Sequence, residues 1–248
     1  TYEGEGGVAL TGLTRRLAFA LRFSDSKLLI SDSLTSKSKV VYHRDIAERV
    51  RKAAPFLYFD SDPYPVVVEG RVVWVVDGYT ATSRYPYAEP IDVRGLRREN
   101  GLAQAAGSNY VRNSVKVTVD AYDGTMTFYV VDDNDPLVRT YQRIFPSLFT
   151  DGSKMPTDLV AHLRYPEELF VTQSQLFGRY HVSDPVDFYQ RLDVWERALD
   201  SGLSTVSSRT AAGVSEQQIA DPYYLLMALP GSQTQEFVMM QMFTPTNK

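Results

Sequence analysis

The sequence predicts an α+β fold, in which a mixed or antiparallel sheet built from hairpins carries packed helices. Three pairs of apolar segments flank short turn-forming sequences, as the strands of hairpins do. Between them lie amphipathic segments, two of which begin with an acidic capping residue. The 248 residues are 44% hydrophobic and 23% charged, a composition typical of a globular chain with a substantial core. We therefore expect one domain over residues 1–248.

The first two predicted elements are a helix and a hairpin. The helix covers Asp45 to Ala54, where apolar residues recur at four-residue spacing before Pro55 ends the run. The hairpin covers Val66 to Val76 and turns at Glu69-Gly70. Its nearly unbroken valines predict strands covered on both faces, and therefore a central place in the sheet. A polar insert from Ile91 to Ser108 follows this hairpin.

The second hairpin is predicted over Ser114 to Asp132, with Asp123-Gly124 as a two-residue type I′ turn. This turn places the apolar residues of both strands on one face, with Ala121 opposite Met126, Val119 opposite Phe128 and Val117 opposite Val130. The other face is expected to be wetter, and it carries Lys116, Thr118, Asp120, Thr127 and Tyr129.

Four helices are predicted in the middle of the chain. The first begins at Asp135-Pro136, an N-cap acid followed by Pro at the first helical position, and turns Leu137, Tyr141 and Ile144 inward. The others are predicted from Thr157 to Arg164, from Glu167 to Tyr180, and from Asp184-Pro185 to Leu199.

The last predicted hairpin joins Tyr223–Leu229 to Glu236–Phe243 through Pro230-Gly231-Ser232. Residues 200–217 are rich in Ser, Thr, Gly and Ala, and are interpreted as a surface loop or linker. They do not mark a domain boundary, because a single strand pair is too small to fold alone.

Composition and motifs exclude several classes of function. The net charge of −4 argues against nucleic acid as a partner, and the absence of cysteine excludes disulfides, zinc ribbons and cysteine nucleophiles. His43, His162 and His181 show no metal-ligand spacing, and no GxSxG, GxxxxGK[ST] or GxGxxG pattern is present. We expect no cofactor. Apolar runs end within about eight residues, too short to cross a bilayer.

A few residues remain that could carry chemistry. The acidic runs Asp132–Asp135 and Asp60–Pro63 have oxygen ligands suited to calcium, but turns and a helix cap explain them more simply. His162 and His181 are interpreted as hydrogen-bonded structural residues, although a distant carboxylate could complete an acid–base pair with either.

Tyrosine is abundant, and several of the 16 tyrosines lie beside prolines. Tyrosine rings can stack on sugars or peptides while their hydroxyls form hydrogen bonds, and they can equally close the rim of a core, which we consider the simpler role. The candidate interaction surface consists of Tyr64, Tyr85, Tyr87 and Tyr165.

An ordered series of segments resembles a known family. The segments are Leu13–Phe19, Glu48-Arg49-Val50, Ala54–Leu57, Asp60–Tyr64, Asp77–Thr80, Tyr85-Pro86-Tyr87, Asn109–Lys116, Asp120–Gly124 and His162–Glu167. Together they are similar to the soluble region of uncharacterised protein family 0182 in the UPF series, with agreement from about Leu10 to Phe243. The resemblance implies a multipass membrane protein, found notably in actinobacteria, with transmembrane helices before Thr1 and a domain that continues past Lys248.

The resemblance supplies no reaction and no catalytic residue. It implies that the segment lies outside the cytoplasm, attached to the cell membrane through transmembrane helices that are not in this sequence. The favoured hypothesis is a non-enzymatic module that binds an envelope component or a partner protein. The alternative is an enzyme acting on envelope lipid, glycan or peptide, with His162 or His181 and an aspartate as its acid–base groups. A deep polar pocket around such a pair would favour the enzyme.

Overall fold

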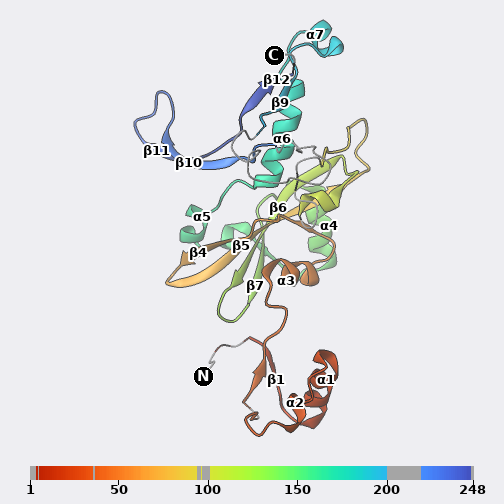
Figure 1. Cartoon of the computed structure of the whole chain (residues 1–248), viewed down its shortest axis with the longest axis vertical. Helices are drawn as coiled ribbons and strands as arrows, with labels where there is room; N and C mark the ends of the chain where they lie inside the picture. Colours follow the sequence, from red (N-terminus) through yellow and green to blue (C-terminus); the bar gives the residue numbers. More distant parts are fainter. Residues whose placement is uncertain are drawn as a thin grey trace, which may run out of the picture.

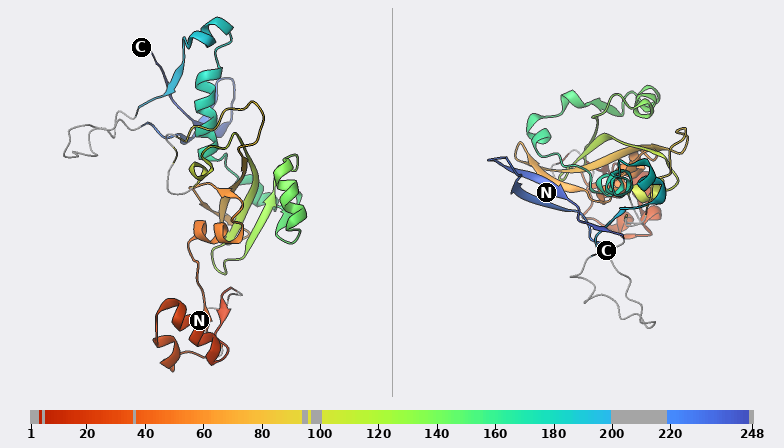
Figure 2. Two further views of the ribbon diagram at one scale, coloured as in Figure 1. Left: turned by 90° about the vertical axis from the view of Figure 1, so that its right-hand side faces the viewer. Right: turned by 90° about the horizontal axis from the view of Figure 1, so that it is seen from above.

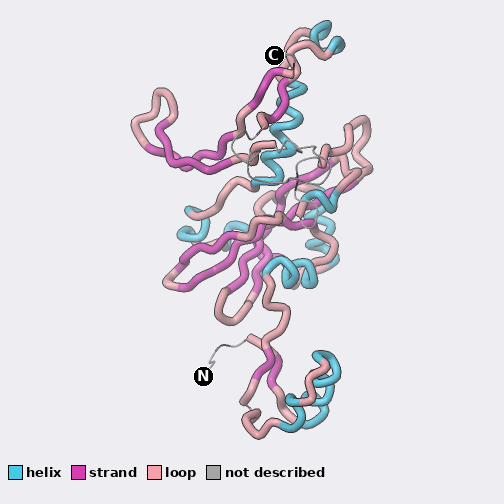
Figure 3. The backbone as a smooth tube through the Cα atoms, viewed as in Figure 1, coloured by secondary structure: helices cyan, strands magenta, loops and turns pink. Residues whose placement is uncertain are grey.

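The computed structural model describes residues 4, 6–35, 37–93, 96, 101–199 and 219–246. The chain is elongated and has three regions along its long axis (Figure 1). A small N-terminal region lies at one end, a β-sheet with flanking helices lies in the middle, and a long helix with two strand pairs lies at the other end. The described residues form helices together with antiparallel and mixed sheets, which confirms the predicted α+β class (Figure 3).

The central sheet is mixed. Its strand order is β3-β5-β6-β7-β8, and β4 also pairs with β5. All neighbours are antiparallel except β7 and β8, which are parallel. The strands are β3 (Tyr58–Phe59), β4 (Tyr64–Val68), β5 (Arg71–Thr82), β6 (Tyr110–Asp120), β7 (Met126–Val130) and β8 (Phe149–Asp151).

The β4–β5 hairpin forms as predicted. Glu69 and Gly70 both have positive φ, 51° and 75°, and Val68 pairs with Arg71, which is the geometry of a type I′ turn. The expectation that both faces are covered is wrong for the outer half of this hairpin. Val67 and Val72 are exposed, because β4 is an edge strand with only one face on the core.

The β6–β7 hairpin forms, but its turn differs from the predicted one. The carboxylate of Asp120 accepts hydrogen bonds from the backbone N–H groups of Tyr122 and Asp123, which organises a four-residue loop over 121–124. Only Gly124 in this loop has positive φ. Val119 therefore pairs with Met126, and the predicted register is wrong by two residues. Because side chains alternate with period two, the predicted apolar face is nevertheless confirmed.

Two helices cover the apolar face of the sheet. They are α3 (Ile46–Ala53) and α4 (Pro136–Ile144). Asp135 caps α4 as predicted, and Asp45, which was expected to lie within the helix, caps α3. Figure 2 shows α4, in green, against this side of the sheet. Val138 is fully buried, whereas Ile144, predicted to face inward, is exposed. The reason is geometric, since six residues turn a helix by about 240° and carry Ile144 away from the sheet.

The opposite face of the sheet is also covered, so the prediction of a wetter face is wrong. Lys116 and Thr118 are buried there. The helices on or near this side include η1 (Leu102–Ala105), η2 (Gly152–Lys154), α5 (Thr157–Ala161) and α6 (Glu167–Tyr180). Two further groups of core residues pack beneath them, one including Met155 and Leu159 and the other including Leu102 and Val171.

The C-terminal region departs from the prediction after α6. The helix expected to reach Leu199 stops as α7 (Pro185–Gln190), because Arg191 adopts the left-handed conformation with φ 56°. The chain then forms β9 (Trp195–Arg197), which pairs with β12 (Phe243–Pro245). The last predicted hairpin is confirmed as β10 (Tyr223–Ala228) and β11 (Gln235–Met240). The predicted loop over 200–217 lies outside the described residues.

The N-terminal region contains a helix that the sequence analysis does not anticipate. Its elements are β1 (Val8–Ala9), α1 (Leu13–Phe23), α2 (Lys27–Ile30) and β2 (Lys39–Val40). The rings of Phe19 and Phe23 contact Tyr42 at centroid distances of 5.8 and 6.4 Å, beside the link to the sheet region. A search of the described helices finds none with the length and apolar character that a bilayer crossing requires.

Candidate functional site

The structure divides the four candidate tyrosines. Tyr64 is only 4% exposed, because the alternation of β4 turns its side chain into the core. Its hydroxyl accepts a hydrogen bond from the backbone N–H of Arg164, whose guanidinium lies 4.3 Å from the ring centroid. Burial raises the pKa of Tyr64 to about 12. The prediction that Tyr64 contributes to a surface is therefore wrong.

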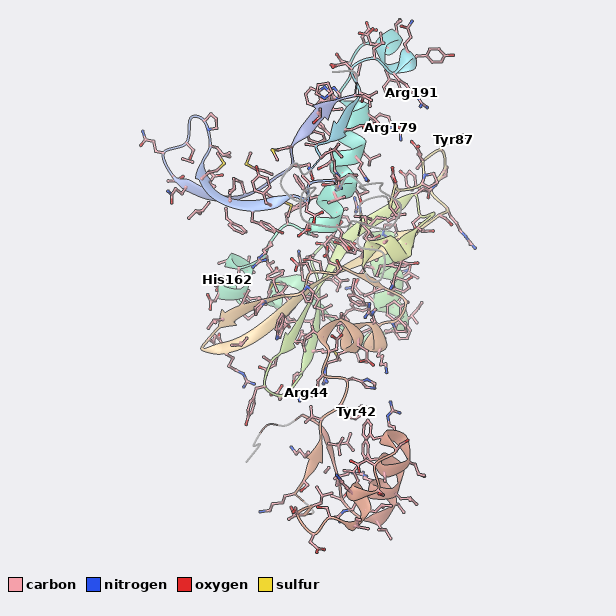
Figure 4. The ribbon with its side chains drawn as sticks, viewed as in Figure 1. Tyr42, Arg44, Tyr87, His162, Arg179 and Arg191 are labelled. Carbon is pink, nitrogen blue, oxygen red and sulfur yellow. The ribbon has the colours of Figure 1, made fainter. Side chains whose placement is uncertain are left out.

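Tyr85, Tyr87 and Tyr165 are exposed. Tyr85 stacks on Tyr110, and Tyr165 donates a hydrogen bond of 2.6 Å to the side chain of Gln173. Tyr87 lies at the tip of the loop after β5 (Figure 4). The described ring contacts and hydrogen bonds join neither Tyr85 nor Tyr87 to Tyr165, so the geometry gives no single tyrosine surface.

All three histidines make local contacts, and the Nδ1 of His43 lies 2.9 Å from the carboxylate of Glu48. His162 is exposed beside α5 (Figure 4), and its Nδ1 lies 2.7 Å from the carbonyl oxygen of Asp158. The Nδ1 of His181 lies 3.1 Å from the carbonyl oxygen of Phe177, and its ring packs on Trp195. The contacts of His162 and His181 lie at helix ends. The carboxylate nearest to His162 is that of Asp158 and the one nearest to His181 is that of Asp193, each at 3.8 Å.

A buried pair of carboxylates, not anticipated as a unit, joins three distant segments. Asp60 accepts hydrogen bonds from the hydroxyl of Tyr79 at 2.5 Å and from the backbone N–H of Glu168 at 3.4 Å. Glu168, in the first turn of α6, accepts from the hydroxyl of Ser61 at 2.8 Å and the backbone N–H of Leu102 at 2.5 Å. The pair therefore ties the end of β3 to η1 and α6.

Burial dominates the electrostatics of this pair. It raises the pKa of Glu168 to about 8, and the nearby charge of Asp60 adds to the effect. Burial also raises the pKa of Asp60, although the Tyr79 hydroxyl opposes this. A neighbouring carboxyl, Asp77, has its pKa raised to about 6 by burial, even though it forms an ion pair with buried Lys116. Shifts of this kind occur in catalytic dyads as well as in structural networks.

The surroundings of the pair favour a structural role. Asp60 is 3% exposed and Glu168 is 4% exposed, and both carboxylates already accept hydrogen bonds from neighbouring groups. A Cβ added to Gly101 would lie within 2.6 Å of the Glu168 carboxyl, so glycine allows this close approach. The turn at Asp60–Pro63 was visible in the sequence, whereas its pairing with Glu168 spans more than a hundred residues and was not.

The second acidic run also has a structural role. Asp135 caps α4 by accepting from the N–H of Leu137, and its carboxylate also accepts hydrogen bonds from the hydroxyls of Thr80, Ser114 and Tyr110. Asp132 forms an ion pair of 2.9 Å with Arg112. The predicted cap is thus confirmed, with three further donors. In the described part of the chain, no cluster of three or more His, Asp or Glu side chains is arranged to hold a metal ion.

The β10–β11 hairpin presents apolar side chains on both faces. Leu226 and Phe237 are directly paired on one face and are 65% and 57% exposed. Tyr223, Leu225 and Met240 are exposed on the other face. The hairpin is fastened at its base, where the hydroxyl of Tyr224 donates to the carbonyl of Tyr165 at 2.7 Å. Its tip projects sideways from the long axis (Figure 1).

A cavity of about 650 Å³ lies between α6, β9 and the loop after β5. One side of α6 lines it with Thr172, Gln175, Leu176 and Arg179. The remaining wall comes from β9 with its flanking residues and from the loop after β5, which includes Glu89. Volumes of 300 to 1,000 Å³ are typical of sites for small molecules. None of the three histidines lines this cavity.

Comparison with known proteins finds one family that matches the whole chain. The sequence model described as "Uncharacterised protein family (UPF0182)" matches residues 1–248. The UPF0182 protein of Trichodesmium erythraeum is 44% identical over 253 residues, which cover 100% of this chain and 26% of that protein. Those of Desulforamulus reducens and Methanospirillum hungatei are 42% and 44% identical, with 100% of this chain and 24% and 25% of theirs covered.

The chain thus spans about a quarter of the length of these relatives. The relatives come from diverse bacteria and an archaeon, a wider range than the actinobacterial one that the resemblance implies. No solved structure matches the chain.

Proposed function

The chain belongs to the uncharacterised protein family UPF0182, and we propose that it is a non-enzymatic interaction module of a larger protein. The observation that carries the proposal is the β10–β11 hairpin. A strand pair with one solvated face alternates apolar and polar residues, whereas these strands are apolar on both faces. An exposed hairpin of this kind is marginal in water and gains stability when both faces are covered.

The occupant that fits the hairpin is another segment of the same longer polypeptide. The relatives are about four times the length of this chain, so they contain ample sequence to supply it. A lipid surface fits less well, because each edge of a two-stranded hairpin carries unpaired backbone N–H and C=O groups that hydrocarbon cannot satisfy. A protein segment can satisfy these groups by adding a strand to the hairpin.

The described geometry gives less support to the enzyme alternative. Asp60 and Glu168, two carboxyls whose pKa values are raised by burial, do not line the 650 Å³ cavity. A general acid or base must come within hydrogen-bond reach of its substrate. We therefore interpret this pair as a structural contact that joins the turn after β3 to η1 and α6.

Photo-crosslinking tests what covers the hairpin. Phe237 is replaced by p-benzoylphenylalanine in the full-length protein. The protein is then irradiated, and the crosslinked peptide is identified by mass spectrometry. We expect a link to a segment outside residues 1–248. The matched control is the same replacement at Val67, an exposed residue paired with exposed Val72 at the edge of the β4–β5 hairpin. Links to lipid alone, or equal links from both positions, would contradict the proposal.

We further propose, from the family resemblance, that this module lies outside the cytoplasm of a multipass membrane protein. The chain contains no cysteine, so a single cysteine introduced at exposed Tyr87 gives a unique label within it. We expect a membrane-impermeant maleimide to label Tyr87→Cys in intact cells, with the unsubstituted protein as the blank. Labelling only after cell lysis would place the module in the cytoplasm.

A further inference from the structure

Arg197, on β9, is a buried cation without a hydrogen-bond acceptor. The residue is 7% exposed, and none of its three guanidinium nitrogens has a hydrogen-bond partner among the described residues. Asp92 and Asp221 lie near enough for their charges to favour the charged form of Arg197, but neither accepts a hydrogen bond from it. A buried charge without a hydrogen bond is costly, so such a group usually has a ligand or a structural partner.

The cavity beside α6 is where an acceptor could enter. Arg197 is one of its lining residues, next to the apolar side chains of Leu176, Val194 and Trp195. Arg179, the other arginine of the lining, is already engaged by Glu89 through two contacts of 3.0 Å. Figure 4 shows Arg179 on α6. Of the two arginines described in this lining, Arg197 is therefore the one without a hydrogen-bonded carboxylate.

We propose that this cavity binds a small amphipathic anion, whose single carboxylate or phosphate group is held by Arg197 and whose apolar body packs on Leu176, Val194 and Trp195. Arginine suits this role because its planar fork matches either head group with two parallel hydrogen bonds. The guanidinium nitrogens are shielded from water, and binding of the head group therefore requires the Arg197 side chain to turn toward the cavity.

The other charged residues restrict the ligand. Glu89 and Arg179 form an ion pair, and the acidic residue Glu196 also lines the cavity. A second anionic group on the ligand would be repelled by the carboxylate of Glu196. The site therefore selects one anionic group on an otherwise apolar molecule. This site is independent of the β10–β11 hairpin, and either proposal can fail without the other.

Binding to the 248-residue chain is measured by calorimetry and by thermal shift, with octanoate, octyl phosphate, octanol and inorganic phosphate as probes. We expect octanoate or octyl phosphate to bind and to raise the melting temperature, and the comparison of the two identifies the preferred head group. Octanol lacks the charge and inorganic phosphate lacks the apolar body, so both should bind more weakly by about tenfold or more.

Three variants connect the binding to Arg197. Arg197→Met should weaken binding of the charged probe by at least about tenfold, and Arg197→Lys by less, because it keeps the charge and loses the fork. Arg191→Met, at an exposed arginine in the loop after α7, is the control and should bind like the parent chain. In the absence of ligand, Arg197→Met should melt at or above the temperature of the parent, because it removes an uncompensated buried charge.

Two results would overturn the proposal. The first is equal affinity for octanol and octanoate, or no binding of either charged probe at about 10 mM, a concentration that detects even millimolar dissociation constants. The second is a lower melting temperature for Arg197→Met without ligand, which would mean that Arg197 already has a structural partner. If Arg197→Met does not fold, unchanged octanoate and octyl phosphate binding by Arg197→Lys, with no loss of preference over octanol, would overturn it as well.

Discussion

Single carboxylates hold together segments that are far apart in the sequence. Asp135 accepts hydrogen bonds from hydroxyl groups on β5 and β6 while it caps α4. Glu168 accepts hydrogen bonds from a hydroxyl in the turn after β3 and from a backbone N–H of η1. Each of these carboxylates can accept several hydrogen bonds at once, because a carboxylate has about four acceptor positions. Substitutions at these residues should therefore affect stability more than their local roles as cap or first-turn residue would indicate.

The first prediction concerns Asp135. Asp135→Ala removes the helix cap and leaves the hydroxyls of Thr80 and Ser114 buried without their acceptor, so we expect a loss of about 3 kcal/mol or more in the free energy of unfolding. The matched control is Asp184→Ala, which removes the cap of α7 and no buried partner and should cost about 1 kcal/mol. Urea denaturation measures both. Equal losses would show that the inward hydroxyls contribute nothing.

The second prediction is a pH dependence that originates at Glu168. Its pKa is about 8 in the folded chain against an ordinary value of 4.5, so between these values the folded state keeps a proton that the unfolded chain releases. Stability therefore falls as pH rises through this window, by up to about 1.4 kcal/mol per pH unit. Glu168→Gln imitates the protonated form, and its side chain can still accept from the N–H of Leu102.

Urea denaturation at pH 5, 6.5 and 8 measures this dependence. The stability of Glu168→Gln relative to the parent should rise as pH rises, because only the parent loses this contribution. The control Glu236→Gln, at an exposed glutamate on β11, should follow the parent chain across the series. Parallel curves for all three proteins would place the pKa of Glu168 near its ordinary value and contradict the prediction.

At the scale of elements, turns and caps explain what could be predicted from the sequence. Glu69-Gly70 predicts its turn correctly because consecutive positive φ angles at those two residues suffice to define it. Asp123-Gly124 has the same residue pattern, yet the side chain of Asp120 captures two backbone N–H groups and selects a longer loop. Such local competition between side chain and backbone depends on atomic geometry, which periodicity does not contain. The starts of α4 and α7 were predictable because their caps, Asp135 and Asp184, act on backbone groups only two or three residues away.

The third prediction concerns the contact between α6 and β9. A Cβ added to Gly178 would lie 2.3 Å from the carbonyl oxygen of Trp195, which is backbone and cannot turn aside. Alanine normally stabilises a helix by about 1 kcal/mol relative to glycine, but here we expect Gly178→Ala to lower stability by roughly 1–3 kcal/mol. Gln173→Ala, on the exposed face of α6, is the control and should change it little.

Thermal melting and tryptophan fluorescence check this prediction together. Gly178→Ala should move β9 away from α6, so the emission of Trp195 should change along with the melting temperature. The other tryptophan, Trp74, lies in the central sheet and should not respond. A higher melting temperature for Gly178→Ala would mean that the helix propensity of alanine outweighs the close contact.

At the scale of the whole molecule, the sheet was more predictable than the candidate site. Valine runs and turns indicate which segments pair, because strand pairing follows patterns read along the chain. The candidate tyrosines were chosen by composition, which does not distinguish inward Tyr64 from outward Tyr87. Arg197 attracted no attention because its unusual property is the absence of an acceptor in three dimensions. The prediction of one domain over residues 1–248 stays a prediction.

The last prediction concerns how stability is distributed along the molecule. Val75, Val76, Val115 and Val117, on β5 and β6, are fully buried, whereas most apolar residues of β10 and β11 are partly or largely exposed. The described hydrophobic residues of the N-terminal region include only Leu10 and Ala20 as buried ones. Local opening costs least where few apolar contacts are lost. In hydrogen exchange of the 248-residue chain, amides of β5 and β6 should therefore exchange slowest.

The same experiment on the full-length protein separates intrinsic stability from docking. If another segment covers the hairpin there, the amides of β10 and β11 should become protected, while those of β5 and β6 should change little because they are already paired on both sides. Protection of the hairpin equal to that of the central strands in the short chain would contradict the predicted gradient. If the amides of β10 and β11 also exchange fast in the full-length protein, the predicted gradient still holds, but the proposal that another segment covers the hairpin is contradicted.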